Sequence, residues 1–280
     1  GKSVDELAFA IGEGIHQINI ESETEFDRVL DLAQRAVRTV RIALRINPGI
    51  EAGGHDKIST GRKTDKFGIS AGHALELYRR AEKHAFVEPV GLAMHIGSQI
   101  SDVSAFAGAF DYLAEATDDM RRKGLTVSRL DLGGGLGVAY HDDEQELPLE
   151  DYGALLKSLA LRTDAQLTIE PGRWLVAGAG VLVTRVNAIK QAGDRRFVIV
   201  DAAMNDLIRP TLYDAHHPVW PVDNHEDAAL HPSTVAGPVC ESGDILAFDA
   251  PLPGLAAGDL VTVGHAGAYG AVMSSGYNGR

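Results

Sequence analysis

Residues 129–135, with the sequence RLDLGGG, decide the fold more than any other stretch, because a short apolar strand leads directly into three glycines. Two similar transitions occur at residues 95–98 (HIGS) and 170–173 (EPGR), each after a predicted strand. Polar and glycine-rich residues at the carboxyl ends of successive strands are typical of the active-site end of a (β/α)8 barrel. A doubly wound open sheet, the alternative, gathers such residues at one switch point. The sequence therefore favours the barrel.

Alternating strands and helices before residue 180 predict a parallel sheet. The predicted strands are residues 16–20, 40–46, 90–96, 129–133 and 167–170. The predicted helices are residues 24–38, 71–84, 104–123 and 149–161. At the first helix we expect Ser22 as the amino-terminal cap and an apolar stripe made of Phe26, Val29, Leu30, Ala33 and Val37. Five strands cannot close a barrel of eight, so we expect a partial (β/α)8 TIM-type barrel whose first three strands precede Gly1.

The pattern changes after about residue 180. Short β segments, separated by glycine and proline without a long helix, are predicted at 181–189, 196–200, 244–248 and 259–263. The sequence thus predicts an α/β fold with two domains. A (β/α) barrel domain that lacks its first strands covers residues 1–178, and a C-terminal β-rich domain that lacks its end covers residues 179–280.

Composition excludes several kinds of function. The 280 residues carry a formal net charge of −13 that is spread along the chain, which argues against nucleic acid as a partner. No apolar run approaches the roughly 18 residues of a membrane span, so we expect no membrane association. Cys240 is the single cysteine, so no intrachain disulfide can form, and we expect a cytoplasmic protein.

Four histidines lie between residues 215 and 232, namely His216, His217, His225 and His231. Such a cluster suggests a metal site. However, the spacings match no standard zinc pattern and no cysteine joins the histidines. We therefore predict a solvated loop here and no metal.

The residues after the strands have functional and structural interpretations. Three glycines let backbone N–H groups approach an anion closely, and a tight turn without a ligand is the alternative. Ser98 would add a hydroxyl to an anion site, and Arg173 a charge. Glu170 is either an ion-pair partner of Arg173 or a carboxylate that keeps a pyridine nitrogen protonated, which makes the ring an electron sink. His95 taken alone is more often a hydrogen-bonded structural residue.

Six motifs occur in a fixed order along the chain. They are residues 95–100 (HIGSQI), 131–137 (DLGGGLG), 170–173 (EPGR), 205–213 (NDLIRPTLY), 237–244 (GPVCESGD) and 267–270 (GAYG). This series resembles the fold-type III decarboxylases that depend on pyridoxal 5'-phosphate (PLP), and the resemblance covers residues 1–280. It implies PLP as the cofactor, an amino acid as the substrate and a homodimer with shared active sites.

The resemblance also implies a role for each motif. His95 stacks on the cofactor ring, and Glu170 lies at the pyridine nitrogen. The groups implied to hold the phosphate region are Ser98, Gly134, Gly135, Gly172, Arg173 and Tyr269. The groups implied to line the substrate are Arg173, Arg209, Tyr213, Glu241 and Tyr269. Cys240 is implied as the proton donor to the site of the other subunit, and a thiol with a pKa of about 8.5 is mostly protonated at neutral pH.

The charges expected around the far end of the substrate distinguish between the possible substrates of this family. Ornithine needs only an anion at its far end, whereas diaminopimelate, with an ammonium and a carboxylate there, needs an anion and a cation. Glu241 with Arg209 and Arg173 offers both, so we expect decarboxylation of meso-2,6-diaminopimelate to L-lysine and CO2, the last step of lysine biosynthesis. Two alternatives stay open: a decarboxylase of the arginine, ornithine or carboxynorspermidine type, and a non-catalytic PLP-binding homologue.

One departure from the family concerns the lysine that binds the cofactor covalently. The family has it on the first barrel strand, and no matching segment occurs in this sequence. Lys57, Lys63 and Lys66 lie in the long loop between residues 47 and 69, and Lys2 is not at that position either. We therefore expect a sequence truncated at both ends that is inactive by itself.

Overall fold

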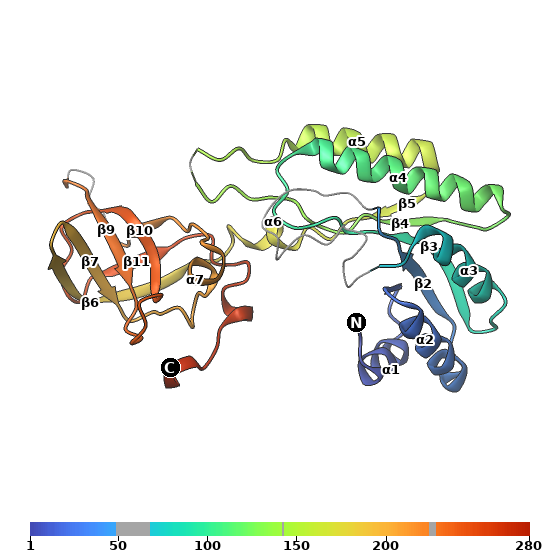
Figure 1. The fold of residues 1–280 in the computed structure, drawn as a ribbon, viewed down its shortest axis with the longest axis horizontal. Coiled ribbons are helices and arrows are strands. Elements are labelled where there is room, and N and C mark those ends of the chain that lie inside the picture. The colour runs from blue at the N-terminus through green and yellow to red at the C-terminus, as the bar shows by residue number, and fades with distance from the viewer. Residues whose placement is uncertain (49–67, 142, 224–227) are drawn as a thin grey trace. The chain divides into compact units, whose positions relative to one another are not determined.

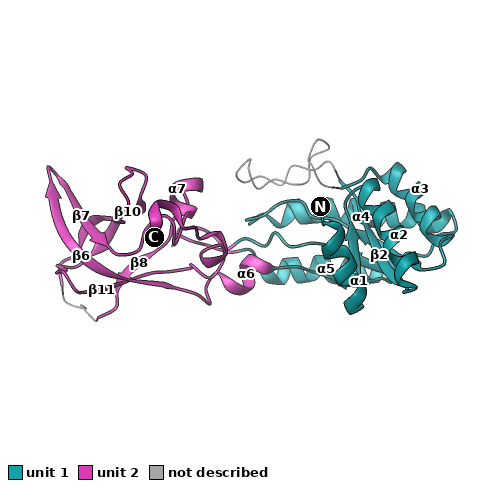
Figure 2. Ribbon diagram, turned by 90° about the horizontal axis from the view of Figure 1, so that it is seen from below, with its two compact units in different colours: residues 1–137, 147–171 teal, residues 138–146, 172–280 magenta. Residues whose placement is uncertain are grey.

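The computed structural model describes residues 1–48, 68–141, 143–223 and 228–280. Lys57, Lys63, Lys66 and His225 lie outside these ranges. The chain packs as two compact units, residues 1–137 with 147–171 and residues 138–146 with 172–280 (Figure 2). Packing thus divides the chain after residue 171 and assigns residues 138–146 to the second unit. The domain limits expected from the sequence, 1–178 and 179–280, stay a prediction, because packing units and domains need not coincide.

The first unit contains a parallel sheet of five strands in the order β1-β2-β3-β4-β5 (Figure 1). The strands are β1 (Ile18–Ile20), β2 (Val40–Arg45), β3 (Val87–Ala93), β4 (Arg129–Asp131) and β5 (Gln166–Thr168). Each neighbouring pair is parallel. Within the described residues β1 and β5 are the edges of this sheet, which agrees with the predicted partial barrel.

Helices alternate with these strands, as predicted. They are α1 (Val4–Glu13), α2 (Glu23–Ala36), α3 (Ala71–Glu82), α4 (Val103–Arg122) and α5 (Leu149–Thr163). Sequence reasoning missed α1, although Ser3 and Glu6 form a capping box that marks its start. None of the helices in the described ranges is long and apolar enough to cross a membrane.

Helix α2 shows how the local sequence sets an element. The hydroxyl of Ser22 accepts a hydrogen bond from the backbone N–H of Glu25 at 3.2 Å, which confirms the predicted cap. Phe26 and Val29 are buried on the predicted stripe. The placement of Val37 on that stripe is wrong, because this residue leaves the helix with a φ of 51° and is 69% exposed. A left-handed cap turns the side chain off the helical face.

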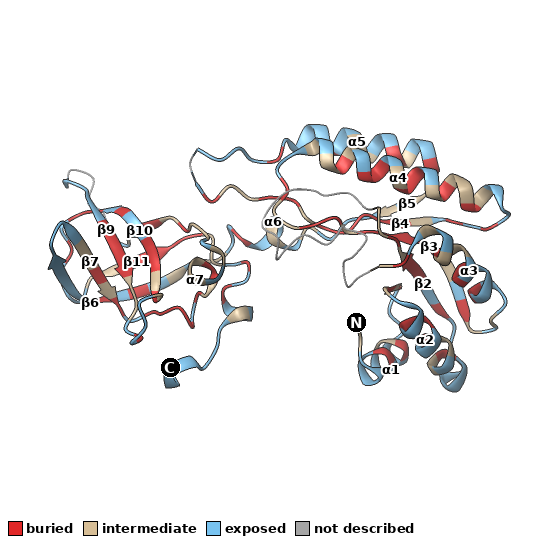
Figure 3. Ribbon diagram, in the orientation of Figure 1, coloured by how far each residue is buried: buried red, intermediate tan, exposed pale blue. Residues whose placement is uncertain are grey.

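The core of the first unit joins the sheet to its helices, and buried residues run along β2 and β3 (Figure 3). Phe106 of α4 packs edge-on against Tyr152 of α5, with ring centres 5.1 Å apart. Phe110, one turn further along α4, lies 6.0 Å from the same ring. These aromatic contacts hold together α4 and α5, the helices that precede and follow β4 in the chain.

The second unit contains a six-stranded sheet in the order β10-β9-β7-β6-β11-β8. Its strands are β6 (Leu182–Ala192), β7 (Arg195–Val200), β8 (Val219–Pro221), β9 (His231–Ala236), β10 (Ile245–Leu252) and β11 (Leu260–Val263). Two short helices accompany them, α6 (Gly172–Val176) and α7 (Arg209–Tyr213). All strand pairs are antiparallel except β7 with β9. The β-rich character of this part of the chain is as predicted.

The solvated loop predicted between residues 215 and 232 is wrong. Strand β8 lies within it and pairs with β11, and His231 begins β9. His217 is only 1% exposed. The prediction failed because it weighed the polarity of the histidines and ignored that buried hydrogen bonds can satisfy a polar ring.

Candidate functional site

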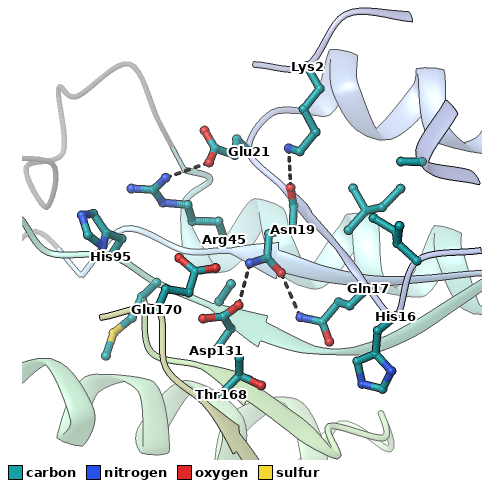
Figure 4. A pocket seen from close by; sticks show the side chains of 15 residues that line it. Lys2, His16, Gln17, Asn19, Glu21, Arg45, His95, Asp131, Thr168 and Glu170 are labelled. Carbon is teal, nitrogen blue, oxygen red and sulfur yellow. Dashed lines mark hydrogen bonds and ion pairs between the residues drawn. The ribbon is translucent and has the colours of Figure 1, made fainter. Parts of the chain in front are cut away.

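The carboxyl ends of β1 to β5 border a cavity of about 460 Å³ (Figure 4). Its polar lining consists of Lys2, His16, Gln17, Asn19, Glu21, Arg45, His95, Asp131, Thr168 and Glu170. Arg45, Asp131 and Thr168 are the last residues of β2, β4 and β5. Because parallel strands end at the same edge of a sheet, residues far apart in the sequence meet here, as the barrel prediction requires.

His95 presents a neutral ring to this cavity. Its Nδ1 accepts a hydrogen bond from the backbone N–H of Gly134 at 3.2 Å, so the ring proton is on Nε2. Burial lowers the pKa of His95 to about 4, and the charge of Arg45 adds to the shift. An uncharged aromatic ring at this place can lie against a flat heterocyclic ligand.

At the triple glycine three chain segments approach too closely for any side chain. A Cβ atom on Gly134 would lie 2.2 Å from the carbonyl oxygen of Glu170, and one on Gly135 would lie 2.6 Å from the carbonyl oxygen of Gly97. Gly135 also has a φ of 100°, which side chains disfavour. Ser98 follows Gly97 in the same loop and is half-buried. The segments that carry the predicted cofactor residues of the first unit therefore meet.

Two carboxyl groups lie close together in the cavity, those of Asp131 and Glu170 (Figure 4). Asp131 is 4% exposed and accepts hydrogen bonds from Nδ2 of Asn19 at 2.7 Å and from the N–H of Gly133 at 3.0 Å. Both bonds hold the carboxyl group of Asp131 in place. Glu170 is exposed as a whole residue, but packing around its carboxyl group and the charge of Asp131 raise its pKa. A cation beside Glu170 would relieve this repulsion.

In the second unit two arginines meet on one tyrosine. Nη1 of Arg173 donates a hydrogen bond to the hydroxyl of Tyr140 at 3.1 Å. The guanidinium carbon of Arg209 lies 4.5 Å from the centre of the same ring. Arg173 also lies over the ring of Tyr269, at 4.8 Å. Tyr140 thus connects two predicted site residues, Arg173 and Arg209, and Arg173 in turn contacts a third, Tyr269. The cluster carries two positive charges.

Cys240 and Glu241 are both exposed. Nδ2 of Asn278 lies 3.4 Å from the sulfur of Cys240. The hydroxyl of Tyr277 donates a hydrogen bond to the carboxylate of Glu241 at 2.7 Å. Within the second unit these two predicted residues are therefore held by the segment around residue 277.

The other predicted residues have less specific surroundings. Tyr213 is half-buried at the end of α7, the helix that Arg209 begins. A Cβ atom on Gly172 would meet nothing within 4 Å, so packing gives no reason for glycine there. No group of three or more histidine, cysteine, aspartate or glutamate side chains within the described ranges is placed to hold a metal ion.

Sequence reasoning gave no role to several residues that build these sites. Asn19 and Arg45 were detectable, because each stands near the carboxyl end of a predicted strand, where His95 and Glu170 also stand. Tyr140 carried no signal, because it lies in a connection between elements. Only the three-dimensional structure brings it against Arg173 and Arg209.

The parallel strand ends, the glycine turn and the carboxyl pair are the features of a cofactor-binding barrel. The family model of the pyridoxal-binding domain of pyridoxal-dependent decarboxylases matches residues 1–177. The chain therefore belongs to the pyridoxal-dependent decarboxylases, as its motifs predicted.

Within this family the chain is similar to diaminopimelate decarboxylases. It is 43% identical to the enzyme of Zymomonas mobilis and 41% identical to that of Neisseria meningitidis, over 100% of its own length and 66% and 68% of theirs. Its structure matches that of diaminopimelate decarboxylase from Helicobacter pylori complexed with L-lysine, with a TM-score of 0.93 and 40% identity. That match covers 99% of this chain and 69% of the other. The chain thus spans about two thirds of the length of these relatives.

PLP, the cofactor of this family, suits the residues of the first unit. Asp131 and Glu170 offer negative charge to a protonated pyridine nitrogen. The neutral ring of His95 offers a flat surface. The turn at Gly134 and Gly135 lets backbone groups approach an anion such as a phosphate.

Proposed function

We propose that this chain belongs to an enzyme that decarboxylates meso-2,6-diaminopimelate to L-lysine and CO2 with PLP. The observation that carries the proposal is Arg209, which is 6% exposed and forms no ion pair with any described residue. Among the described residues it contacts the ring of Tyr140 and the imidazole of His217. A buried charge without a counter-ion is costly, so this cation favours a ligand that brings a carboxylate. Diaminopimelate has one at its far end, whereas ornithine, arginine and lysine do not.

The similarity to curated diaminopimelate decarboxylases supports the same substrate. The relative from Helicobacter pylori was solved with L-lysine, which is the product of this reaction. An enzyme binds its product with much of the machinery that binds its substrate. The comparisons and the charge of Arg209 therefore point to one reaction.

When bound, PLP supplies a pyridinium ring that takes up the electrons left behind by departing CO2. The carboxylate of Glu170 would stabilise a proton on the ring nitrogen, and the positive ring would in turn offset the burial and the charge of Asp131 that raise the pKa of Glu170. His95 would lie against one face of the ring and shield it from water. The groups that we assign to the phosphate region are Ser98, Gly134, Gly135, Gly172, Arg173 and Tyr269.

On the substrate, Arg209 binds the distal carboxylate and Glu241 the distal ammonium, with Arg173, Tyr213 and Tyr269 as further lining residues. The thiol of Cys240 donates a proton to the carbon that has lost CO2, and its exposure leaves it accessible for this task. We also infer a homodimer in which Cys240 serves the site of the other subunit. We also infer a cytoplasmic location, because the proposed reaction makes an amino acid for use inside the cell.

The test compares substrates in the full-length protein loaded with PLP. We expect kcat/KM for meso-diaminopimelate to exceed the values for ornithine and arginine by at least about 100-fold, because a site built for a distal carboxylate rejects ligands without one. A preference for ornithine or arginine would support the decarboxylase of another amino acid. PLP binding without turnover of any of them would support the non-catalytic homologue.

A further inference from the structure

Arg209 is oriented by two groups that carry no charge. It begins α7, and Nη1 of its guanidinium lies 2.8 Å from Nε2 of His217. The guanidinium also lies over the face of the Tyr140 ring. An arginine in an ordinary protein core is held by a carboxylate, which also cancels its charge. Here the described residues orient the guanidinium and leave its charge in place.

The hydrogen bonds of His217 determine which of its nitrogens carries the proton. Arginine can only donate, so Nε2 of His217 accepts from Arg209. The proton is then on Nδ1, which donates to the carbonyl oxygen of Gly264 at 2.9 Å. His217 is 1% exposed, and burial lowers its pKa to about 4. The imidazole is therefore neutral at physiological pH.

The anchor of His217 is itself rigid. The backbone N–H of Gly264 donates to the carbonyl of Pro218 at 2.8 Å. A Cβ atom on Gly264 would lie 2.5 Å from the ring of Trp220, so the backbone is packed directly against that side chain. The edge of the His217 ring also meets Tyr140, with ring centres 5.3 Å apart. The hydrogen bond at Nδ1 and the contact with Tyr140 thus fix the orientation of the imidazole ring, so the lone pair on Nε2 points toward Arg209.

We propose that His217 is a positioning residue that aims the Arg209 guanidinium while preserving its positive charge for a substrate carboxylate. This inference rests on the proposed function, in which Arg209 binds the distal carboxylate. It assigns specificity to a residue that need not touch the substrate. A neutral acceptor at this position keeps the arginine available, whereas a carboxylate there would satisfy it internally.

The experiment replaces His217, the hydrogen-bond acceptor of Arg209, once by a neutral acceptor and once by a charged one. His217→Gln supplies a neutral acceptor, and His217→Glu supplies a carboxylate of the same size. His216→Glu is the matched control, because it adds the same charge one residue away. The native ring of His216 stacks on His141. All three are made in the full-length protein, and circular dichroism and thermal unfolding check that they fold.

Two readouts separate charge from structure. The first is kcat and KM for meso-diaminopimelate. The second is the calorimetric affinity of the cofactor-free protein for glutarate, a dicarboxylate that needs no turnover. For His217→Glu we expect KM to rise and glutarate affinity to fall by about tenfold or more, with kcat less affected. His217→Gln and His216→Glu should stay within about threefold of the unmutated protein on both readouts.

Each outcome decides something. Equal losses in His217→Gln and His217→Glu, with equal losses of thermal stability, would show that His217 only supports the fold and would overturn the inference. Absence of glutarate binding by the unmutated protein would overturn it as well. If the unmutated protein binds glutarate with the expected pattern among the variants but does not decarboxylate meso-diaminopimelate, the positioning role stands and the proposed function fails.

Discussion

The two compact units gather opposite charges at the residues that we assign to the reaction. In the first unit Asp131 and Glu170 bring two carboxyl groups together, and the charge of Asp131 raises the pKa of Glu170. In the second unit Arg173 and Arg209 bring two guanidinium groups to the ring of Tyr140. Like charges repel until an opposite charge binds beside them. The comparison indicates that the first unit is suited to a cation, such as a protonated cofactor ring, and the second to a carboxylate.

The charges are also held in different ways. Asp131 ends a strand and is fixed by Asn19 on β1 and by the backbone of Gly133, so its position follows from the sheet. Arg209 is fixed by the side chains of Tyr140 and His217. Residues on or directly after the strands of the sheet thus hold the first arrangement, and side chains from connections between elements hold the second. We therefore expect substitutions in the second unit to change substrate preference and those in the first to change cofactor chemistry.

The largest expected effect is that of Arg209→Leu in the full-length enzyme, which removes the cation. Loss of a hydrogen-bonded charge pair in a closed site costs roughly 2–5 kcal/mol. That corresponds to about 30-fold to several thousand-fold in kcat/KM for meso-diaminopimelate. Arg209→Lys, the control, keeps the charge without the planar fork and should lose less. Equal losses for meso-diaminopimelate and ornithine would indicate that Arg209 only stabilises the fold.

The next effect concerns the carboxyl pair. Glu170→Ala should lower kcat by about 10²–10³-fold, the range for loss of one preorganised electrostatic group. The absorbance band of bound PLP should remain, because other groups hold the phosphate. Glu170→Gln has the same shape without the charge and should behave similarly. Near-normal turnover in both variants would contradict the assignment to the ring nitrogen.

A third prediction concerns pH and the buried His217. The pKa of its ring is lowered to about 4 in the folded protein, whereas the unfolded chain has the ordinary value of about 6.5. The unfolded state therefore binds a proton first, so the stability contributed by the neutral ring is complete above pH 6.5 and is lost as the pH falls toward 4. His217→Gln should remove up to about 3 kcal/mol of this pH dependence, measured by urea unfolding at a series of pH values. His231→Gln, at an exposed position, is the control and should change nothing.

The smallest effect tests the close approach at the glycine turn. Gly134→Ala places a Cβ atom 2.2 Å from the carbonyl oxygen of Glu170, so the backbone must move. We expect a loss of about 1–3 kcal/mol in the free energy of unfolding and weaker PLP binding. Gly172→Ala is the control for stability alone, because nothing lies within 4 Å of its Cβ position. If both variants lost the same stability, steric crowding at Gly134 would not be the cause.

Much of the cofactor end could be predicted from the sequence. Parallel strands have a fixed direction, so His95, Gly134 and Glu170, each placed just after a strand, had to come to the same edge of the sheet. The prediction did not extend to Asn19 as the partner of Asp131, although both lie on predicted strands. Which strand residues face each other depends on register and strand order, and periodicity alone does not determine these.

What the sequence by itself determined about this protein is the alternation of elements, the glycine turn and the motifs of the decarboxylase family, because these depend on local conformation and on order along the chain. Only the tertiary structure decided that His217 is buried, that it accepts a hydrogen bond from Arg209, and that Tyr140 joins Arg209 to Arg173. These contacts connect residues from separate loops and helices. Their free energy depends on desolvation and on distances between groups that are remote in sequence, and no local pattern encodes those quantities.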